Sequence, residues 1–182
     1  NFADEKHIHY DGELEKDLQV KTIIINPMQQ GALSKIPLFG VADYTWNMET
    51  FNNMESWRAS LPAVLGKEMA QDFETIVPYL RYYDSTSALA QMINTFKAAY
   101  KKNPAAAVTE KAALKAELAK IDNACKAVGK MKESANACDT LFYADLRPFL
   151  LKLQVMAQTT EFMVDALTSE NLQGIDAVGF AK

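Results

Sequence analysis

From residue 52 onward, apolar residues recur at spacings of three and four, which is the pattern of amphipathic helices. Helix-breaking or capping residues interrupt this pattern at short intervals. It predicts helices over residues 52–65, 67–83, 87–102, 109–129 and 136–168. Because only a few residues separate these stretches, we expect antiparallel neighbours. The sequence therefore predicts a mainly α fold, an up-and-down bundle of about five helices.

Local signals define where these helices begin and end. Asn52 with Glu55 three residues later resembles a capping box, and Gly66 marks the end of that helix. Residues 84–86, Asp-Ser-Thr, are expected to cap the third helix, and Asn103-Pro104 to end it. Arg147-Pro148 predicts a break in the last helix. The residues expected to face the core include Phe73, Ile76, Leu89, Phe96, Leu114, Leu118, Ile121 and Cys125.

The stretch before this helical region has a different pattern. Residues 20–25, VKTIII, form a β-branched run without helical periodicity, which is typical of a strand buried on both faces. Asn26 is a suitable N-cap and Pro27 a suitable first residue for a helix, which Pro37 should kink. In α/β folds, ligands bind at the carboxyl ends of strands. Asn26 is therefore either a substrate contact, a helix cap, or both.

Two motifs in this stretch carry a family resemblance. Asn26-Pro27-Met28 is followed by LSKIPLFGVADYTWN over residues 33–47. Together they resemble bacterial β-N-acetylglucosaminidases of glycoside hydrolase family 84, which includes enzymes that remove O-linked GlcNAc and some named hyaluronidases. The likeness continues more weakly through Ser56-Trp57 into the helical remainder, which resembles the post-catalytic bundle of that family. Gly31-Ala32 departs from the pattern, because relatives more often have Ala-Glu there.

The resemblance implies a domain organisation. Residues 1–51 are expected to form the C-terminal end of a catalytic (β/α)8 barrel, as a strand followed by a kinked helix. Residues 52–168 are expected to form the bundle that packs on this upstream barrel, and residues 169–182 a tail or linker. The resemblance also implies a bacterial exported protein, periplasmic or extracellular.

The resemblance implies an activity as well, removal of terminal GlcNAc from a glycan or glycoprotein by substrate-assisted, retaining hydrolysis. In that family an adjacent Asp pair, one of which is the general acid/base, orients the N-acetyl group of the sugar that attacks the anomeric carbon. This chain contains no Asp-Asp, so we expect no catalytic residue in it and no activity from it alone. Asn26 matches the family Asn that hydrogen-bonds sugar hydroxyls. The alternative is a non-catalytic helical interaction or assembly module.

Composition narrows the possible functions. The 182 residues are too few for a barrel of about 250 residues together with a bundle. With 49% hydrophobic and 23% charged residues, the chain has the composition of a globular protein. A formal charge of −4 provides no basic face for nucleic acid. No apolar run is long enough to span a membrane.

Other candidate chemistry has simpler explanations. His7 and His9 flank Ile8 without a third ligand nearby, and the spacing of Cys125 and Cys138 does not fit a zinc site, so we expect no metal and no cofactor. The two cysteines are either buried apolar residues, which we favour, or a disulfide.

Three aromatic residues, Tyr44, Trp46 and Phe51, are expected in the loop that leaves the kinked helix. Exposed aromatic rings could stack on a sugar. More often such a cluster is the packed seam between two domains, which is the interpretation we favour.

Overall fold

The computed structural model describes residues 22–80 and 87–168. These residues confirm the mainly α fold class, and no strand occurs among them. The helices are α2 (Lys35–Trp46), α3 (Asn53–Leu65), α4 (Lys67–Leu80), α5 (Ala88–Lys102), α6 (Val108–Gly129) and α7 (Ala137–Thr168), with two short 3-10 helices, η1 (Pro104–Ala106) and η2 (Lys130–Glu133).

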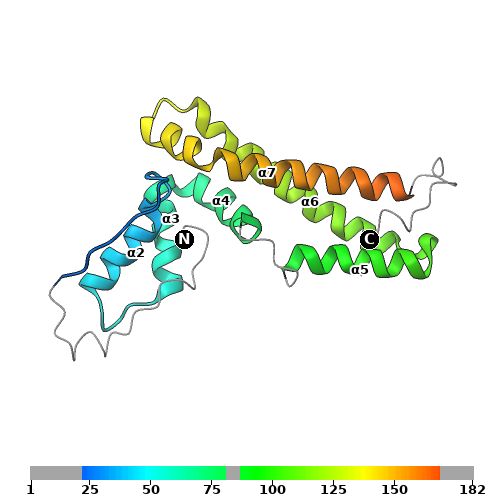
Figure 1. Cartoon of the computed structure of the whole chain (residues 1–182), viewed down its shortest axis with the longest axis horizontal. Coiled ribbons are helices and arrows are strands. Elements are labelled where there is room, and N and C mark those ends of the chain that lie inside the picture. Colours follow the sequence, from blue (N-terminus) through cyan, green and yellow to red (C-terminus); the bar gives the residue numbers. More distant parts are fainter. Residues whose placement is uncertain (1–21, 81–86, 169–182) are drawn as a thin grey trace.

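Helix α6 lies at the centre of the arrangement. It contacts α4, α5 and α7, while α2 packs on α3 and α3 on α4. Figure 1 shows that α6 runs antiparallel to both α5 and α7, and that α2 and α3 lie at the opposite end of an elongated molecule. The helices therefore form two groups. Helices α2 and α3 make up one, α5, α6 and α7 make up the other, and α4 joins them.

Helix α3 begins and ends where the sequence predicts. Oδ1 of Asn52 accepts hydrogen bonds from the backbone N–H groups of Met54 at 3.0 Å and Glu55 at 3.1 Å. These bonds pair two of the N–H groups that a helix start leaves without a partner. At the other end Gly66 has φ 78°, a backbone conformation that residues with a side chain rarely adopt. Asn52 and Gly66 thus fix both ends of α3.

The cap of α5 is one residue later than predicted. The Ser87 hydroxyl accepts from the Ala90 N–H at 3.3 Å, whereas residues 84–86 lie outside the described residues. The predicted end is confirmed, because α5 stops before Asn103, whose Oδ1 accepts from Ala105 N at 3.1 Å.

The break predicted at Pro148 is wrong, because α7 is one continuous helix of 32 residues. A proline costs a helix one hydrogen bond and crowds the preceding turn. Pro148 is exposed, while Leu146 and Leu150 on either side of it are buried in the core. Their burial holds both turns on the rest of the molecule, which offsets the cost of the proline.

The core runs through all six of these helices. Its rings include Phe73 of α4 and Phe142 of α7, which meet edge to face with centroids 5.6 Å apart. The eight residues named above as expected to face the core are buried, and Leu33, two residues before α2, and Ile36, in its first turn, belong to the same cluster. The core cluster therefore has members on both sides of the position between residues 51 and 52, where the domain boundary stays a prediction.

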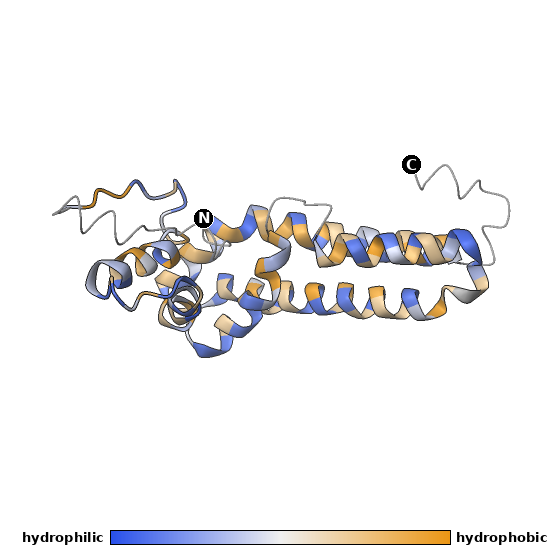
Figure 2. Ribbon diagram, turned by 90° about the horizontal axis from the view of Figure 1, so that it is seen from below, coloured by the Kyte–Doolittle hydropathy of each residue, from blue (hydrophilic) through white to orange (hydrophobic). Residues whose placement is uncertain are grey.

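The described part of the predicted strand, Thr22 to Ile25, has no regular structure, and neither have the residues that follow it up to Met28. Ile24 is 93% exposed, and Figure 2 shows a hydrophobic stretch on an extended segment outside the helices. A strand needs a neighbouring strand for its backbone hydrogen bonds, and the described residues supply none. Val20 and Lys21 lie outside the described residues.

The helix predicted to begin at Pro27 begins eight residues later, at Lys35. Asn26 therefore caps no helix. Pro37 occupies the first turn of α2, where its missing N–H leaves no hydrogen bond within α2 unmade.

Candidate substrate-binding segment

The candidate site is the segment from Asn26 to Ser34, which we call the Asn26 segment. Asn26 and Pro27 are exposed, Met28 is partly buried against the core, and Leu33 and Ser34 are fully buried. The segment thus passes from solvent into the core within a few residues. Asn26 lies at its exposed end, where its carboxamide is accessible to a ligand.

Ser34 holds the segment together. Its hydroxyl donates to the Gln30 carbonyl oxygen at 2.9 Å and lies 3.3 Å from the carbonyl oxygen of Met28. The Ser34 backbone N–H also donates to the Gln30 carbonyl oxygen, at 3.0 Å. This last bond has helical spacing, so one helical turn precedes α2. The buried hydroxyl therefore links the backbone near Asn26 to the beginning of α2.

A residue far along the chain contributes a further contact. Oδ2 of Asp145, on α7, accepts a hydrogen bond from the backbone N–H of Ala32 at 2.7 Å. A carboxylate at the start of a helical turn is favourable because the first N–H groups of such a turn have no partner within it. Sequence reasoning did not identify Asp145, because the two residues are 113 positions apart.

The three aromatic residues do not form one cluster. Tyr44 is buried and meets Phe51 edge to face, with centroids 5.3 Å apart, whereas Trp46 is 88% exposed. Tyr44 and Trp46 belong to α2 and not to the loop after it, which corrects the prediction. Because α2 turns once in 3.6 residues, two residues separated by two positions face different directions. Tyr44 and Phe51 pack against each other, as expected for a packed seam, whereas the Trp46 side chain is exposed to solvent.

The cysteines form no disulfide. Cys125 is buried and Cys138 is exposed, so the interpretation as buried apolar residues holds for Cys125 alone. Burial, and then the charge of Asp122, raise the pKa of the Cys125 thiol to about 12, which keeps it protonated and unreactive. No group of three or more potential metal ligands occurs among the described residues, while His7 and His9 lie outside them. In the described part of the chain, no helix is long and apolar enough to cross a membrane.

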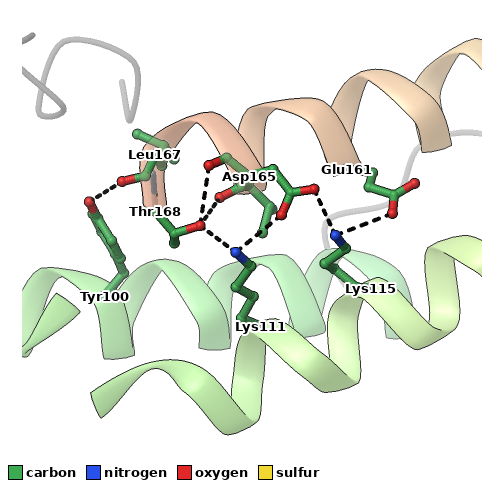
Figure 3. A network of polar contacts seen from close by, with 8 residues as sticks. Tyr100, Lys111, Lys115, Glu161, Asp165, Leu167 and Thr168 are labelled. Atoms are coloured by element: carbon green, nitrogen blue, oxygen red, sulfur yellow. Dashed lines mark hydrogen bonds and ion pairs between the residues drawn. The ribbon is translucent and has the colours of Figure 1, made fainter. Parts of the chain in front are cut away.

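A polar network lies at the end of the molecule away from α2 and α3, where it connects α5, α6 and α7 (Figure 3). Lys115 Nζ lies 2.6 Å from Oδ2 of Asp165, and Lys111 Nζ lies 3.1 Å from its Oδ1. Hydrogen bonds from Lys115 and then Lys111 lower the pKa of Asp165, although slight burial opposes this. Tyr100 adds a bond from α5 to the Leu167 carbonyl oxygen. The network joins three helices and is remote from the Asn26 segment.

Comparison with known proteins gives a family match that covers the candidate segment. Residues 6–78 match the sequence model of the family NAGidase, described as beta-N-acetylglucosaminidase. The matched range contains the Asn26 segment, α2, α3 and most of α4. No solved structure matches the chain. Over residues 6–78 this chain is therefore similar to the beta-N-acetylglucosaminidase family, which confirms the resemblance found in its motifs.

Proposed function

We propose that this chain forms the C-terminal part of an exo-β-N-acetylglucosaminidase, comprising the end of the catalytic barrel and the bundle that supports it. The family match runs without interruption from the exposed Asn26 segment into the helices. A glycosidase of this family has a GlcNAc-containing glycan as its substrate. The helices then support a site to which the Asn26 segment contributes.

The exposed isoleucines are the observation that carries this proposal. Ile23, Ile24 and Ile25 are 36%, 93% and 42% exposed in the described structure. Full burial of such a side chain contributes about 1.5–3 kcal/mol. Parallel strands of a barrel bury both faces, so three consecutive isoleucines suit one more strand there. In the complete enzyme, residues 22–25 pair with a neighbouring barrel strand and lose this exposure.

Pairing of that strand gives Asn26 its role. The residue then follows the carboxyl end of a barrel strand, which is the face where (β/α)8 barrels bind their substrates. A carboxamide both donates and accepts, as does each sugar hydroxyl. Asn26 is exposed and caps no helix, so its side chain is available for this contact. It binds hydroxyls away from the reacting carbon.

The chemistry belongs to residues outside this chain. In the mechanism implied by the resemblance, the N-acetyl group attacks the anomeric carbon and an adjacent Asp pair orients it and transfers the proton. The sequence has no adjacent Asp residues, so the pair is placed upstream. The isolated chain should therefore release no 4-nitrophenol from its β-GlcNAc glycoside, and release that is lost with a point change in this chain would contradict the proposal.

Kinetics of the full-length protein test the role of Asn26. Asn26→Ala removes a donor and an acceptor together, and should lower kcat/KM about ten- to two-hundredfold. Asn26→Asp keeps the acceptors, loses the donor and should also lower kcat/KM. Neither change should alter Tm, since Asn26 caps no helix. Asn52→Ala is the matched control, since it removes a cap and leaves kcat/KM unchanged. Unchanged kinetics in both Asn26 variants would remove the site assignment.

A further inference from the structure

The Asn26 segment is held by a helix that lies outside the family match. The match ends at residue 78, whereas the carboxylate that accepts from Ala32 N belongs to Asp145 on α7. The bond is 2.7 Å long and partly buried, which is short for an amide donor and typical of a charged acceptor. The bundle thus contacts the backbone six residues after Asn26.

We propose that Asp145 is a positioning residue for the sugar site, which fixes the Asn26 segment on the bundle so that the Asn26 carboxamide meets the substrate. This inference rests on the proposed function of Asn26. Asp145 itself contacts backbone and no reacting atom. Its effect reaches the substrate through the conformation of residues 26–34.

The carboxylate of Asp145 is held by a rigid part of the molecule, because α7 is packed on both sides of this residue. Phe142 and Leu146, which flank Asp145, are 2% and 0% exposed, and α7 packs along α6. The backbone of Asp145 therefore cannot shift without disturbing the core. A packed helix is a more precise support for a functional residue than a loop is.

The connection continues from Ala32 toward Asn26. Leu33, the next residue, is 0% exposed, and Ser34 bonds back to the Gln30 carbonyl oxygen and lies close to that of Met28. Met28 is two residues from Asn26 and packs against the core. A hydrogen bond thus joins Asp145 to Ala32, the backbone joins Ala32 to Ser34, and the Ser34 hydroxyl contacts the Met28 carbonyl oxygen, which connects α7 to the residues next to Asn26.

Loss of the Asp145 carboxylate should make the Asn26 segment more mobile, while the buried Leu33 and Ser34 still hold it on the core. In the full-length protein, Asp145→Ala should lower kcat/KM about three- to tenfold, because a small displacement of a binding group weakens transition-state binding. Asp145→Asn keeps an oxygen acceptor of the same shape and should retain most of the activity. Comparison of Asp145→Asn with Asp145→Ala therefore shows whether the hydrogen bond to Ala32 N matters, apart from the charge of the side chain.

Three measurements test the inference. Hydrogen exchange of the Ala32 N–H should speed up in Asp145→Ala and much less in Asp145→Asn. In the Asn26→Ala background, Asp145→Ala should lower kcat/KM no further, because it acts through Asn26. Asp165→Ala is the matched control, since it removes another carboxylate of α7 that bonds to a neighbour and should leave kcat/KM unchanged.

The outcomes separate the two proposals. If Asn26→Ala lowers kcat/KM and Asp145→Ala does not, the positioning role is overturned and the site assignment stands. Equal losses of kcat/KM in Asp145→Ala and Asp165→Ala would reduce Asp145 to a general stabilising residue. Unchanged kinetics in the Asn26 variants would overturn the site assignment and the positioning role with it.

Discussion

Two apolar regions of this molecule have similar residues and opposite surroundings. The isoleucines 23–25 are exposed on an extended segment, while Leu118, Ile121 and their neighbours on α6 are fully buried. Hydrophobicity alone therefore does not explain the difference. Backbone hydrogen bonding does, because a helix pairs its own N–H and C=O groups whereas a strand needs another strand to do so.

The comparison shows which parts of the chain are complete in themselves. Helices α2 to α7 need only apolar stripes that face one another, and the described residues provide them. The segment before α2 has the composition of a buried strand, and the described residues provide no neighbour for it. We therefore expect changes in the helices to affect stability, and changes at residues 22–26 to affect function in the complete enzyme.

The largest expected effect comes from removing α2 and the segment before it. A chain of residues 52–168 lacks Leu33 and Ile36, which are 0% and 1% exposed in the shared core. At about 1.5–3 kcal/mol for each side chain, its free energy of unfolding should fall by about 3–6 kcal/mol. The matched control is residues 29–168, which keep both side chains. Urea denaturation of the two chains measures the difference.

This truncation also tests the predicted domain boundary. A cooperative transition in residues 52–168 with the same midpoint as in residues 29–168 would show that α2 adds nothing to the bundle. The boundary between residues 51 and 52 would then stand as predicted.

Two single substitutions compare the stability contributed by one buried and one exposed apolar side chain. Leu118→Ala, in a position that is 1% exposed, should cost about 2–5 kcal/mol because it leaves a cavity. Ile24→Ala, in a position that is 93% exposed, should change the stability of this chain by less than about 0.5 kcal/mol. In the full-length enzyme the same Ile24→Ala should become clearly destabilising. An equal, small effect in both proteins would argue against burial of this residue in a barrel.

The sequence predicted the helices well because their determinants are local. Asn52, Gly66 and Asn103 each act on residues within a few positions, and the spacing of Leu114, Leu118 and Ile121 identifies the buried face of α6. Such features depend little on the rest of the molecule.

The errors concern features that depend on distant parts of the chain. Pro148 breaks no helix because residues on both sides of it are buried in the core, and Asp145 meets Ala32 only in the folded molecule. Neither could be predicted from neighbours in sequence. Local signals make Asn26 a suitable cap, which is one of its two predicted roles, yet α2 begins at Lys35.

The two asparagines provide a smaller test of the same contrast. Asn52 accepts two backbone hydrogen bonds at the start of α3, so Asn52→Ala should cost about 1 kcal/mol. Asn26 caps no helix, so Asn26→Ala should leave the stability of this chain unchanged. Thermal unfolding of the two variants measures both effects. A loss of stability in Asn26→Ala would show that the segment forms a capped helix start in solution.

The smallest effect is expected at the far end of α7, in the network around Asp165. Hydrogen bonds from Lys115 and then Lys111 hold the pKa of this carboxyl below its ordinary value. A group whose pKa is lowered on folding stabilises the protein above its unfolded pKa, and that stabilisation is lost as pH falls through the folded pKa. The Asp165 side chain is 45% exposed, so solvent screens the pair. Asp165→Asn should therefore lower Tm by only about 2 °C at about pH 6, and the difference from wild type should vanish as the pH falls to about 2.

Two further measurements on Asp165→Asn complete this test, namely Tm at high salt and kcat/KM of the full-length enzyme. Because the pair is exposed, about 1 M NaCl should remove most of the difference in Tm at about pH 6. The kcat/KM of the full-length enzyme should be unchanged by Asp165→Asn, since the network is remote from the Asn26 segment. A difference in Tm that persists at low pH would assign the stabilisation to packing of the side chain and not to its charge. A fall in kcat/KM would show that both ends of α7 act on the site, and the contrast between Asp145 and Asp165 would fail.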